Sequence, residues 1–412
     1  MKSKVLTHDQ EQAAIYDADP LIFREISDRI LTGLFDAGKR VVEDAGAIRV
    51  PTLVLAADQD WVVHNGPQRR FIENMKQGGT PGCKFEVLEK THHAVFHEVQ
   101  REAIIAKVAD YLEDTFKAPA PNAQVLLNAD QQGWTHAEYQ RLAAPAGCCE
   151  KIGYGLVRLA MKTLGRASQG IRVGWQTGFD SGASLDYVYE NQARGCGPLG
   201  RFLDRAYLDG IGWQGIRARK ANLQRVLKDA IAQVKAAGLP VQVLDLATGH
   251  GRYVLEVLKD EPTARAELRD WNADHVASAA ALATTLGVSQ VVCKQADAFD
   301  PAAITSATPQ PTVAIVSGLY ELFPSNAKVL ASLKALAQVL PISGQLVLTG
   351  QPYHPQMAFI ARVLDNREGK PWVMRRRTSA ELNALLREAG FTPVRMETDA
   401  WGIFTVTLAE KH

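Results

Sequence analysis

One segment of the sequence places a carboxylate and two glycines at the end of an apolar run, a spacing that can hold a small ligand. Residues 243–253 read VLDLATGHGRY, so Asp245 ends the apolar run and Gly249 and Gly251 follow it. Glycine lets a ligand approach the backbone closely, and the free N–H groups of such a loop face that ligand. The segment therefore predicts a ligand-binding loop, in which Ala247 is a further small residue.

The carboxylate of Asp245 indicates which ligand this loop would hold. A dinucleotide-binding GxGxxG loop would have its third glycine at position 254, where this chain has Val254. A carboxylate inside the turn would also repel a pyrophosphate, whereas it would attract the ammonium and sulfonium groups of S-adenosylmethionine. The loop therefore favours S-adenosylmethionine, and a nicotinamide oxidoreductase stays as an alternative.

Two further acidic residues follow the next two predicted strands. Asp270 comes about 20 residues after the glycines, the spacing at which an acidic side chain accepts hydrogen bonds from ribose hydroxyls. Asp297 lies in the segment QADAF and could accept a hydrogen bond from an adenine amino group, while Ala298 and Phe299 pack on the ring. Together with the loop, these strand ends predict a nucleoside site.

Candidate catalytic residues follow two later predicted strands. Tyr320 and Glu321 lie in SGLYELFP, and His354 lies in GQPYHP. In-line methyl transfer mainly requires alignment, and a general base helps when the acceptor must lose a proton. We predict these three side chains as catalytic candidates, with a packing or capping role as the alternative for each.

Aromatic and charged residues upstream of the loop are candidates for an acceptor site. They lie in GFDSGASLDYVYENQARG and YLDGIGWQGIRARK, in a stretch where we expect a lid or helical cap. Packing within that cap is an equal alternative. The candidates are Asp180, Tyr187, Tyr189, Trp213 and Arg217.

A second pair of catalytic residue types lies near the N-terminus. PTLVLAADQDWVV carries Asp60 after one predicted strand, and EKTHHAVFHE carries His93 after the next. These segments resemble the last third of α/β hydrolases of the monoacylglycerol-lipase and lysophospholipase type, where an acid and a histidine take these places. The resemblance implies that Asp60 and His93 are the acid and base of a remnant hydrolase. His93 fits better than His92 because Glu98 follows it five residues later.

The nucleophile of such a hydrolase is missing from this sequence. A G-x-S-x-G elbow should precede Asp60, yet the serines there are Ser3 and Ser27, and neither has flanking glycines. Without that hydroxyl acyl transfer cannot proceed by this route, so we do not expect hydrolase activity of this chain. We favour a truncated start over a docking module, because missing strands would leave open sheet edges. A lysophospholipase-like hydrolase whose N-terminal half is absent here is the alternative.

The predicted elements divide the chain into four parts. Residues 1–118, with helices over 19–44 and 99–116 and strands over 50–57 and 84–88, indicate a partial α/β-hydrolase domain. Residues 119–125 form a proline- and alanine-rich linker, and residues 126–239 the helical cap. From 240 to 412 strands and helices alternate, which predicts a parallel sheet covered on both faces. The strands are expected near 241–246, 266–269, 288–293, 312–316, 345–349, 394 and 404, and the helices from 252 and over 273–286, 326–340 and 379–389, with caps at Gly287, Thr378 and Gly390.

The part after residue 240 resembles class I S-adenosylmethionine-dependent methyltransferases, which have a Rossmann-like α/β fold. The resemblance is carried by VLDLATGHGRY, RDW, QADAF, PISGQLVLTGQP and LREAGF. It implies that Asp245, Gly249 and Gly251 hold the methionine part of the cofactor, Asp270 the ribose and Asp297 the adenine.

The segment upstream of that core resembles a bacterial methyltransferase family whose members are often fused behind an α/β hydrolase, which implies a bifunctional fusion. The resemblance does not supply the methyl acceptor, for which we expect a small or lipid-like molecule. A noncatalytic ligand-binding subunit is the alternative to an enzyme.

Composition limits the other functions of the chain. Its 46 Lys and Arg residues balance 45 Asp and Glu residues, so no overall field favours nucleic acid. The five cysteines and the histidines at 92, 93 and 97 show no zinc-type spacing, and no metal is predicted. No signal peptide and no run near the roughly 18 apolar residues of a membrane span is present, so we expect a cytoplasmic protein, with oligomerisation left open.

Overall fold

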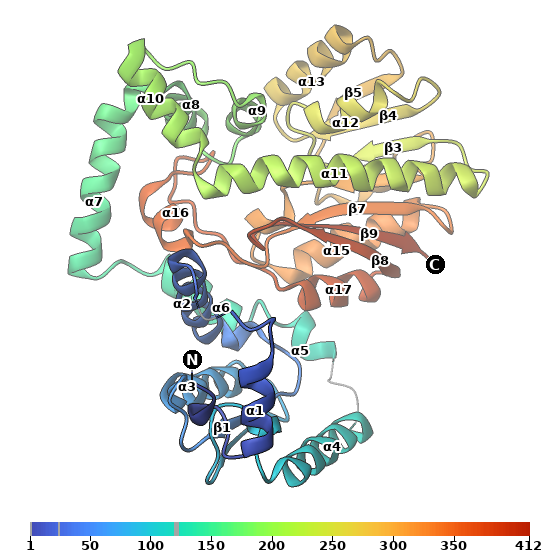
Figure 1. Cartoon of the computed structure of the whole chain (residues 1–412). Coiled ribbons are helices and arrows are strands. Elements are labelled where there is room, and N and C mark those ends of the chain that lie inside the picture. Colours follow the sequence, from blue (N-terminus) through green and yellow to red (C-terminus); the bar gives the residue numbers. More distant parts are fainter. Residues whose placement is uncertain (1, 24, 119–122) are drawn as a thin grey trace. The chain divides into compact units, whose positions relative to one another are not determined.

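The computed structural model describes residues 2–23, 25–118 and 123–412 (Figure 1). The chain forms two compact units, Met1–Ala123 and Gln124–His412. Residue 24 of the predicted helix 19–44 and residues 119–122 of the predicted linker lie outside the described residues. The division into four parts stays a prediction.

The N-terminal unit is built on two parallel strands, β1 (Leu53–Ala57) and β2 (Lys84–Leu88). Ile72 and Met75 of α3 form its small core together with Ala45 and Cys83. The described helices of this unit are α1 (Gln10–Ala18), α2 (Asp28–Glu43), α3 (Asn65–Gln77) and α4 (Arg101–Lys117), with 3₁₀ turns at Ser3–Val5, Ala45–Ala47 and Val95–His97.

The helix predicted for residues 19–44 begins only at Asp28. The Ser27 side chain accepts a hydrogen bond from the backbone N–H of Ile30 and thereby caps the helix at that point. Apolar spacing alone did not locate this start, because the residues before Ser27 share the same pattern.

The larger unit is organised around a seven-stranded sheet with the order β5-β4-β3-β6-β7-β9-β8. Strands β3 to β7 are parallel, whereas β9 runs antiparallel to both β7 and β8. The parallel sheet that we predicted therefore holds for the first five strands. The last two depart from it because no helix separates them, so they pair as a hairpin. The strands are β3 (Gln242–Asp245), β4 (Arg265–Asp270), β5 (Val291–Gln295), β6 (Val313–Val316), β7 (Gln345–Gly350), β8 (Phe391–Thr398) and β9 (Thr405–Lys411).

Helices cover both faces of this sheet, as predicted. Val243 of β3 packs in a cluster with α11, α12 and α13, whereas its neighbour Leu244 packs in a cluster with α15 and α17 on the opposite face. This alternation follows from the two-residue repeat of a strand. The helices are α11 (Ile211–Ala236), α12 (Arg252–Leu258), α13 (Ala273–Leu286), α14 (Pro301–Thr305), α15 (Asn326–Val339) and α17 (Ser379–Glu388).

The strand order reverses between β3 and β6, and this reversal positions the site. In open α/β sheets, ligands bind outside the carboxyl ends of the strands at such a point. The residues that follow β3, β4, β6 and β7 therefore meet at one edge of the sheet.

A helical cap adjoins this edge, in agreement with the helical cap expected from the sequence. Figure 1 shows α8, α9 and α10 gathered beside the beginning of the long helix α11.

No described helix is both long and apolar enough to cross a membrane. The remaining helices are α5 (Ala123–Leu127), α6 (Trp134–Ala143), α7 (Cys148–Thr163), α8 (Gln169–Thr177), α9 (Gly182–Glu190), α10 (Gly197–Leu208) and α16 (Met357–Val363), with 3₁₀ turns at Leu164–Ala167 and Tyr320–Leu322.

The N-terminal cap that the sequence predicts for α17 can be tested by substitution of Thr378. Thr378 Oγ1 accepts a hydrogen bond of 3.2 Å from the backbone N–H of Glu381, as the sequence predicted. We expect Thr378→Ala to lower the free energy of unfolding by about 1 kcal/mol, because one N–H at the helix start loses its partner. Urea denaturation measures this loss. The Ser379→Ala variant removes a neighbouring hydroxyl but keeps the cap, and an equal loss in both variants would contradict the assignment.

Candidate functional site

The predicted ligand-binding loop connects β3 to α12 and lines a cavity, which we call the loop cavity. Gly249 and Gly251 have φ angles of 56° and 71°, which glycine adopts without strain. A Cβ on Gly251 would lie 3.2 Å from Thr248 Oγ1, so a larger residue would crowd the turn. Ala247, Gly249 and Gly251 all line the cavity. Its lining also includes Asp180, Gly182, Leu185, Asp186, Tyr189, Arg219, Asp270, His275, Ser317, Gly318, Leu322 and Arg367.

Asp245 ends β3 directly before this loop and is fully buried. Its Oδ2 accepts a hydrogen bond of 2.6 Å from the hydroxyl of Tyr253, whereas its Oδ1 makes no hydrogen bond to the described residues. Burial raises the pKa of Asp245 to about 7. A cation bound in the loop cavity would stabilise the ionised carboxylate, so the arrangement fits a positively charged ligand.

Asp270 ends β4 and lies on the wall of the loop cavity. Its Oδ2 accepts a hydrogen bond of 2.9 Å from the backbone N–H of Gly249, and its Oδ1 contacts Nδ1 of His275 at 3.1 Å. Burial alone would raise the pKa of Asp270, but these bonds and one from the N–H of Asn272 hold it below its usual value. The carboxylate thus shapes the loop and can still accept a further hydrogen bond on Oδ2.

The predicted adenine contacts lie outside the lining of the loop cavity. Asp297 is exposed and accepts a hydrogen bond of 2.9 Å from the N–H of Phe299, and Ala298 is buried in the core. The ring of Phe299 lies edge to face with that of Phe323, with centroids 4.6 Å apart. An adenine role for these residues stays a prediction.

Ion pairs fasten α9 of the cap to the loop. Asp186 on α9 accepts from Arg252 Nη2 at 2.8 Å and lies 3.5 Å from His250 Nδ1. Burial alone would raise the pKa of Asp186, but these partners hold it far below its usual value. At the start of the same helix, a Cβ on Gly249 would lie 3.5 Å from the Cα of Gly182. The cap therefore helps to enclose the loop cavity.

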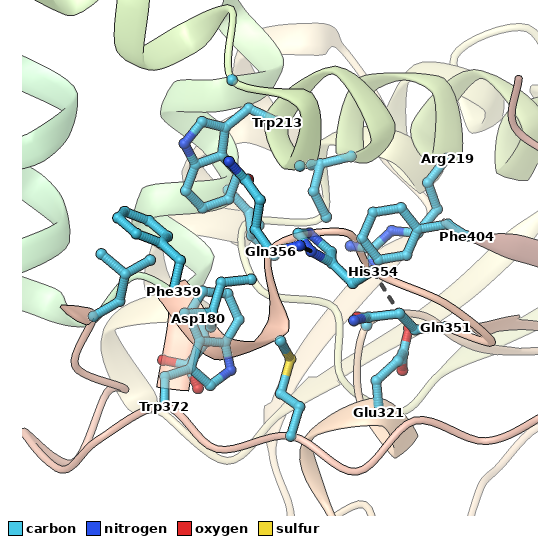
Figure 2. Close-up of a pocket in the computed structure, with 18 of the residues that line it drawn as sticks. Asp180, Trp213, Arg219, Glu321, Gln351, His354, Gln356, Phe359, Trp372 and Phe404 are labelled. Carbon is cyan, nitrogen blue, oxygen red and sulfur yellow. Dashed lines mark hydrogen bonds and ion pairs between the residues drawn. The ribbon is translucent and has the colours of Figure 1, made fainter. Parts of the chain in front are cut away.

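A second cavity of about 220 Å³, which we call the aromatic cavity, adjoins the first. In the view of Figure 2, Trp213, Phe359 and Trp372 occupy the left side, and the polar side chains lie mainly to the right. The labelled residues of its lining are Asp180, Trp213, Arg219, Glu321, Gln351, His354, Gln356, Phe359, Trp372 and Phe404.

The two cavities share part of their walls. The shared residues come from the cap, from α11 and from the segment after β6, and they are Asp180, Leu185, Arg219, Gly318 and Leu322. A ligand in the loop cavity and a second molecule in the aromatic cavity would therefore be neighbours. This arrangement suits a group transfer between them.

His354 lines the aromatic cavity and is buried. Its Nδ1 accepts a hydrogen bond of 3.1 Å from the backbone N–H of Gln356. Burial lowers the pKa of His354 to about 4, so the ring is neutral at neutral pH. A neutral ring with an accepting Nδ1 carries its hydrogen on Nε2.

Glu321 also lines the aromatic cavity and is buried beside Arg219. Its Oε1 accepts from Thr349 Oγ1 at 2.8 Å and lies 3.4 Å from Arg219 Nη1. Its Oε2 is buried and makes no hydrogen bond to any described residue. Glu321 therefore presents an unused acceptor.

Tyr320 does not reach either cavity lining. Its hydroxyl lies in the core, 2.9 Å from Oγ of Ser332, and only 2% of the residue is exposed. Its ring and hydroxyl face α15, whereas the next side chain, Glu321, faces the aromatic cavity. The geometry thus favours a packing role for Tyr320 over a catalytic one.

Three of the five predicted acceptor-site candidates line a cavity in the structure, and the other two do not. Asp180 and Trp213 line the aromatic cavity, and Tyr189 lines the loop cavity. The Tyr187 hydroxyl instead contacts Asp204 in the core, and Arg217 Nη1 donates to the carbonyl of Leu208 at 2.8 Å. Sequence alone could not separate these residues, because the helical bounds that decide their orientation were not predicted there.

Asp180 accepts a hydrogen bond of 2.6 Å from the backbone N–H of Arg367. Burial raises the pKa of Asp180 above its usual value, although Arg367 opposes this effect. A carboxylate of this kind, on the wall that both cavities share, could take a proton from a bound acceptor.

Sequence reasoning missed Arg219, Gln351 and His275. Arg219 lies two positions after Arg217, which the sequence did single out, and Gln351 directly follows β7. A search of every polar residue at the end of a predicted strand would have found Gln351. No sequence signal distinguishes Arg219 from the other arginines of α11.

The predicted hydrolase pair is formed in the N-terminal unit. His93 Nδ1 lies 3.0 Å from Asp60 Oδ2, and Asp60 Oδ1 accepts hydrogen bonds from the N–H groups of Val62 and Val63. Burial raises the pKa of Asp60, but the bond with His93 and the backbone bonds outweigh it and leave the pKa low. Asp60 therefore orients the ring of His93 and leaves Nε2 available.

His8, His92 and Glu98 form the one group of possible metal ligands found among the described residues. Glu98 Oε1 accepts from the backbone N–H of His92 at 2.6 Å, and Oε2 accepts from that of His8 at 3.1 Å. The two histidine rings stack with centroids 3.8 Å apart, and one possible ligand atom from each of the three residues lies within 4.8 Å of the others. The cluster therefore joins two segments of the unit.

Two protein families match this chain, one over its N-terminal part and the other over the larger C-terminal part. The family described as "Putative methyltransferase" matches residues 108–411, and the family described as "Serine aminopeptidase, S33" matches residues 1–100. These matches confirm both resemblances and the fold class predicted from the sequence. "Uncharacterized protein YnbC" of Escherichia coli (strain K12) is 40% identical over 420 residues, which cover 100% of this chain and 71% of that protein.

Solved structures resemble the chain more distantly. A possible exported protein from Bordetella parapertussis has a TM-score of 0.49 at 19% identity, over 72% of this chain and 99% of that one. Magnesium protoporphyrin IX methyltransferase (ChlM) from Synechocystis PCC 6803 with bound SAM has a TM-score of 0.38 at 14% identity, over 65% of this chain and 100% of that one.

Proposed function

Because the chain belongs to the family described as "Putative methyltransferase", we propose that it transfers a methyl group from S-adenosylmethionine to a small, largely apolar acceptor. One observation carries this proposal: a glycine-rich loop cavity and an aromatic cavity share Asp180, Arg219 and Gly318 among their walls. The donor and acceptor of a methyl group must meet at such a junction.

The loop cavity has the features that the cofactor requires. Gly249 and Gly251 keep the loop open, and Asp270 offers an acceptor for a ribose hydroxyl. Asp245 Oδ1 makes no hydrogen bond to the described residues, and the carboxylate would supply negative charge beneath the loop when it is ionised. We carry Asp297, Ala298 and Phe299 forward as proposed adenine contacts, with the support of the resemblance alone.

Bound S-adenosylmethionine supplies a methyl group that its sulfonium already activates. The protein's own contribution is alignment and exclusion of water, which the aromatic cavity achieves with side chains such as Trp213 and Phe404. Where the acceptor must lose a proton, Asp180 is the residue placed to take it. Glu321 and His354 are the remaining proposed catalytic candidates from the sequence.

Formation of S-adenosylhomocysteine tests the proposal. The full chain is incubated with S-adenosylmethionine and a panel of compact aromatic and alicyclic acceptors, and the product is quantified by mass spectrometry. We expect acceptor-dependent turnover that falls strongly in Asp180→Asn. If the protein binds the cofactor but no acceptor yields product, a noncatalytic ligand-binding role is favoured instead.

We also propose that the Asp60–His93 pair has no hydrolase turnover in this chain, because neither Ser3 nor Ser27 lies in a glycine-flanked elbow. Hydrolysis of p-nitrophenyl butyrate by the chain should equal that of its His93→Ala and Asp60→Asn variants. A rate that both substitutions reduce at least tenfold would contradict this expectation.

A further inference from the structure

The polar groups of the aromatic cavity are specific enough to indicate the chemistry of the acceptor. Glu321 Oε2 is a buried acceptor that makes no hydrogen bond to the described residues. His354 Nε2 carries a hydrogen, because Nδ1 already accepts from the backbone N–H of Gln356. Two residues of the cavity lining, Glu321 and His354, therefore carry one buried acceptor and one donor with unused hydrogen-bonding capacity, and both lie on the right in the view of Figure 2.

The position of the His354 donor follows from its neighbours. A Cβ added to Gly212 at the start of α11 would lie 2.9 Å from His354 Nε2, so the absence of a side chain there leaves this nitrogen accessible from the cavity. Gly212 lines the same cavity. The glycine thus leaves space in front of the donor.

The rest of the cavity restricts the size and polarity of the acceptor. Trp213, Phe359 and Trp372 supply large apolar surfaces that suit a ring. The volume of about 220 Å³ lies below the roughly 300–1,000 Å³ of sites for drug-sized ligands, so a compact molecule fits best.

Three kinds of polar group can be compared at this position. A carboxylate has no hydrogen to donate to Glu321 Oε2. A protonated amine could donate to Glu321 but has no lone pair for the hydrogen of His354. A hydroxyl both donates and accepts, and it matches the two groups together.

We infer that the acceptor is a compact, uncharged aromatic or alicyclic molecule with a hydroxyl group, which donates to Glu321 Oε2 and accepts from His354 Nε2. This inference rests on the proposed function, because it takes the aromatic cavity as the acceptor site. In it Glu321 and His354 contact the acceptor directly and fix its orientation.

Binding of four matched probes tests the inference without knowledge of the natural acceptor. The probes are 2-naphthol, 2-methoxynaphthalene, 2-naphthoate and 2-naphthylmethylamine, titrated into the full chain saturated with S-adenosylhomocysteine. Calorimetry should detect 2-naphthol, with the methyl ether at least tenfold weaker and the two charged probes weaker still. Equal affinities, or tightest binding of a charged probe, would overturn the inference.

Two variants test whether the preference for 2-naphthol over its methyl ether depends on Glu321 and His354. Glu321→Gln and His354→Phe should each weaken 2-naphthol about tenfold while they change the affinity for the methyl ether less than twofold. The control Glu368→Gln removes an exposed carboxylate and should change neither affinity. If 2-naphthol binds both variants as tightly as the unaltered chain, the assignment of its hydroxyl to these residues is wrong.

A separate titration with S-adenosylhomocysteine alone distinguishes a failure of this inference from a failure of the proposed function. Cofactor binding without any preference for 2-naphthol would defeat this inference and leave the proposed function intact. Preference for 2-naphthol in a chain that does not bind the cofactor would defeat the proposed function instead.

Discussion

Replacement of Asp270 by alanine should weaken the binding of S-adenosylhomocysteine about 100-fold. The variant loses the bond of 2.9 Å that holds the N–H of Gly249 in the loop, and it also loses the charged acceptor that we propose for the ribose. A hydrogen bond to a charged group contributes about 1.5–3 kcal/mol, and each 1.4 kcal/mol corresponds to a tenfold change in affinity. Isothermal titration calorimetry of both proteins at one pH measures the difference.

A matched control separates this effect from a general loss of carboxylate charge. Asp274 lies in the first turn of α13, four residues after Asp270, and its side chain is exposed. Asp274→Ala should change the affinity less than threefold. An equal loss in both variants would remove Asp270 from the site.

The second large effect concerns Asp245, whose charge the account assigns to attraction of the cofactor. At an effective dielectric constant of about 20, opposite charges about 7 Å apart attract each other by about 2.4 kcal/mol, which corresponds to roughly 50-fold in affinity. Asp245→Asn should therefore weaken S-adenosylmethionine about 50-fold at pH 8. S-Adenosylhomocysteine should lose less, because its sulfur is uncharged. Equal losses for both ligands would contradict an interaction with the sulfonium.

The pKa of Asp245 gives this prediction a pH dependence with a definite sign. Burial raises the pKa to about 7 in the free protein, and a bound cation would lower it again. Binding should therefore release a proton near pH 6.5, and affinity should rise with pH up to about 7 and then level off. Titrations in buffers of different ionisation enthalpy measure the release.

Two ionisable side chains other than Asp245 lie near the loop. His250 lies on the wall of the loop cavity, and His275 contacts Asp270 there. The Asp245→Asn variant retains both histidines, so only the release that disappears in this variant belongs to Asp245. If the variant releases as many protons as the unaltered chain, Asp245 does not titrate on binding.

Much of the fold could be predicted because local patterns and global topology agree. The helix over 273–286 and the strand over 84–88 were predicted at their observed bounds, and Gly287 and Gly390 follow their helices with positive φ. A capping residue or an abrupt change in apolar spacing marks these ends in the sequence. The start of α2 was missed because its cap, Ser27, lies inside a longer apolar pattern.

Several residues of the candidate site could be predicted because they lie at the ends of predicted strands. Asp245, Gly249 and Asp270 were found in this way, since parallel strands bring their carboxyl ends to one edge. Asp180 and Trp213 were among the predicted acceptor-site candidates, whereas Arg219 of α11 was missed, because its approach depends on packing between segments far apart in the sequence. Tyr320 and Glu321 show the same limit, because adjacent residues of one turn face the core and the cavity respectively.

Calorimetric titration of the full chain with S-adenosylmethionine, with S-adenosylhomocysteine and with NAD⁺ tests the central claim most directly. The account predicts one saturable site for each of the first two ligands and no heat from NAD⁺. A folded protein that gives no heat with either sulfur ligand, or that binds NAD⁺ in their place, would contradict it.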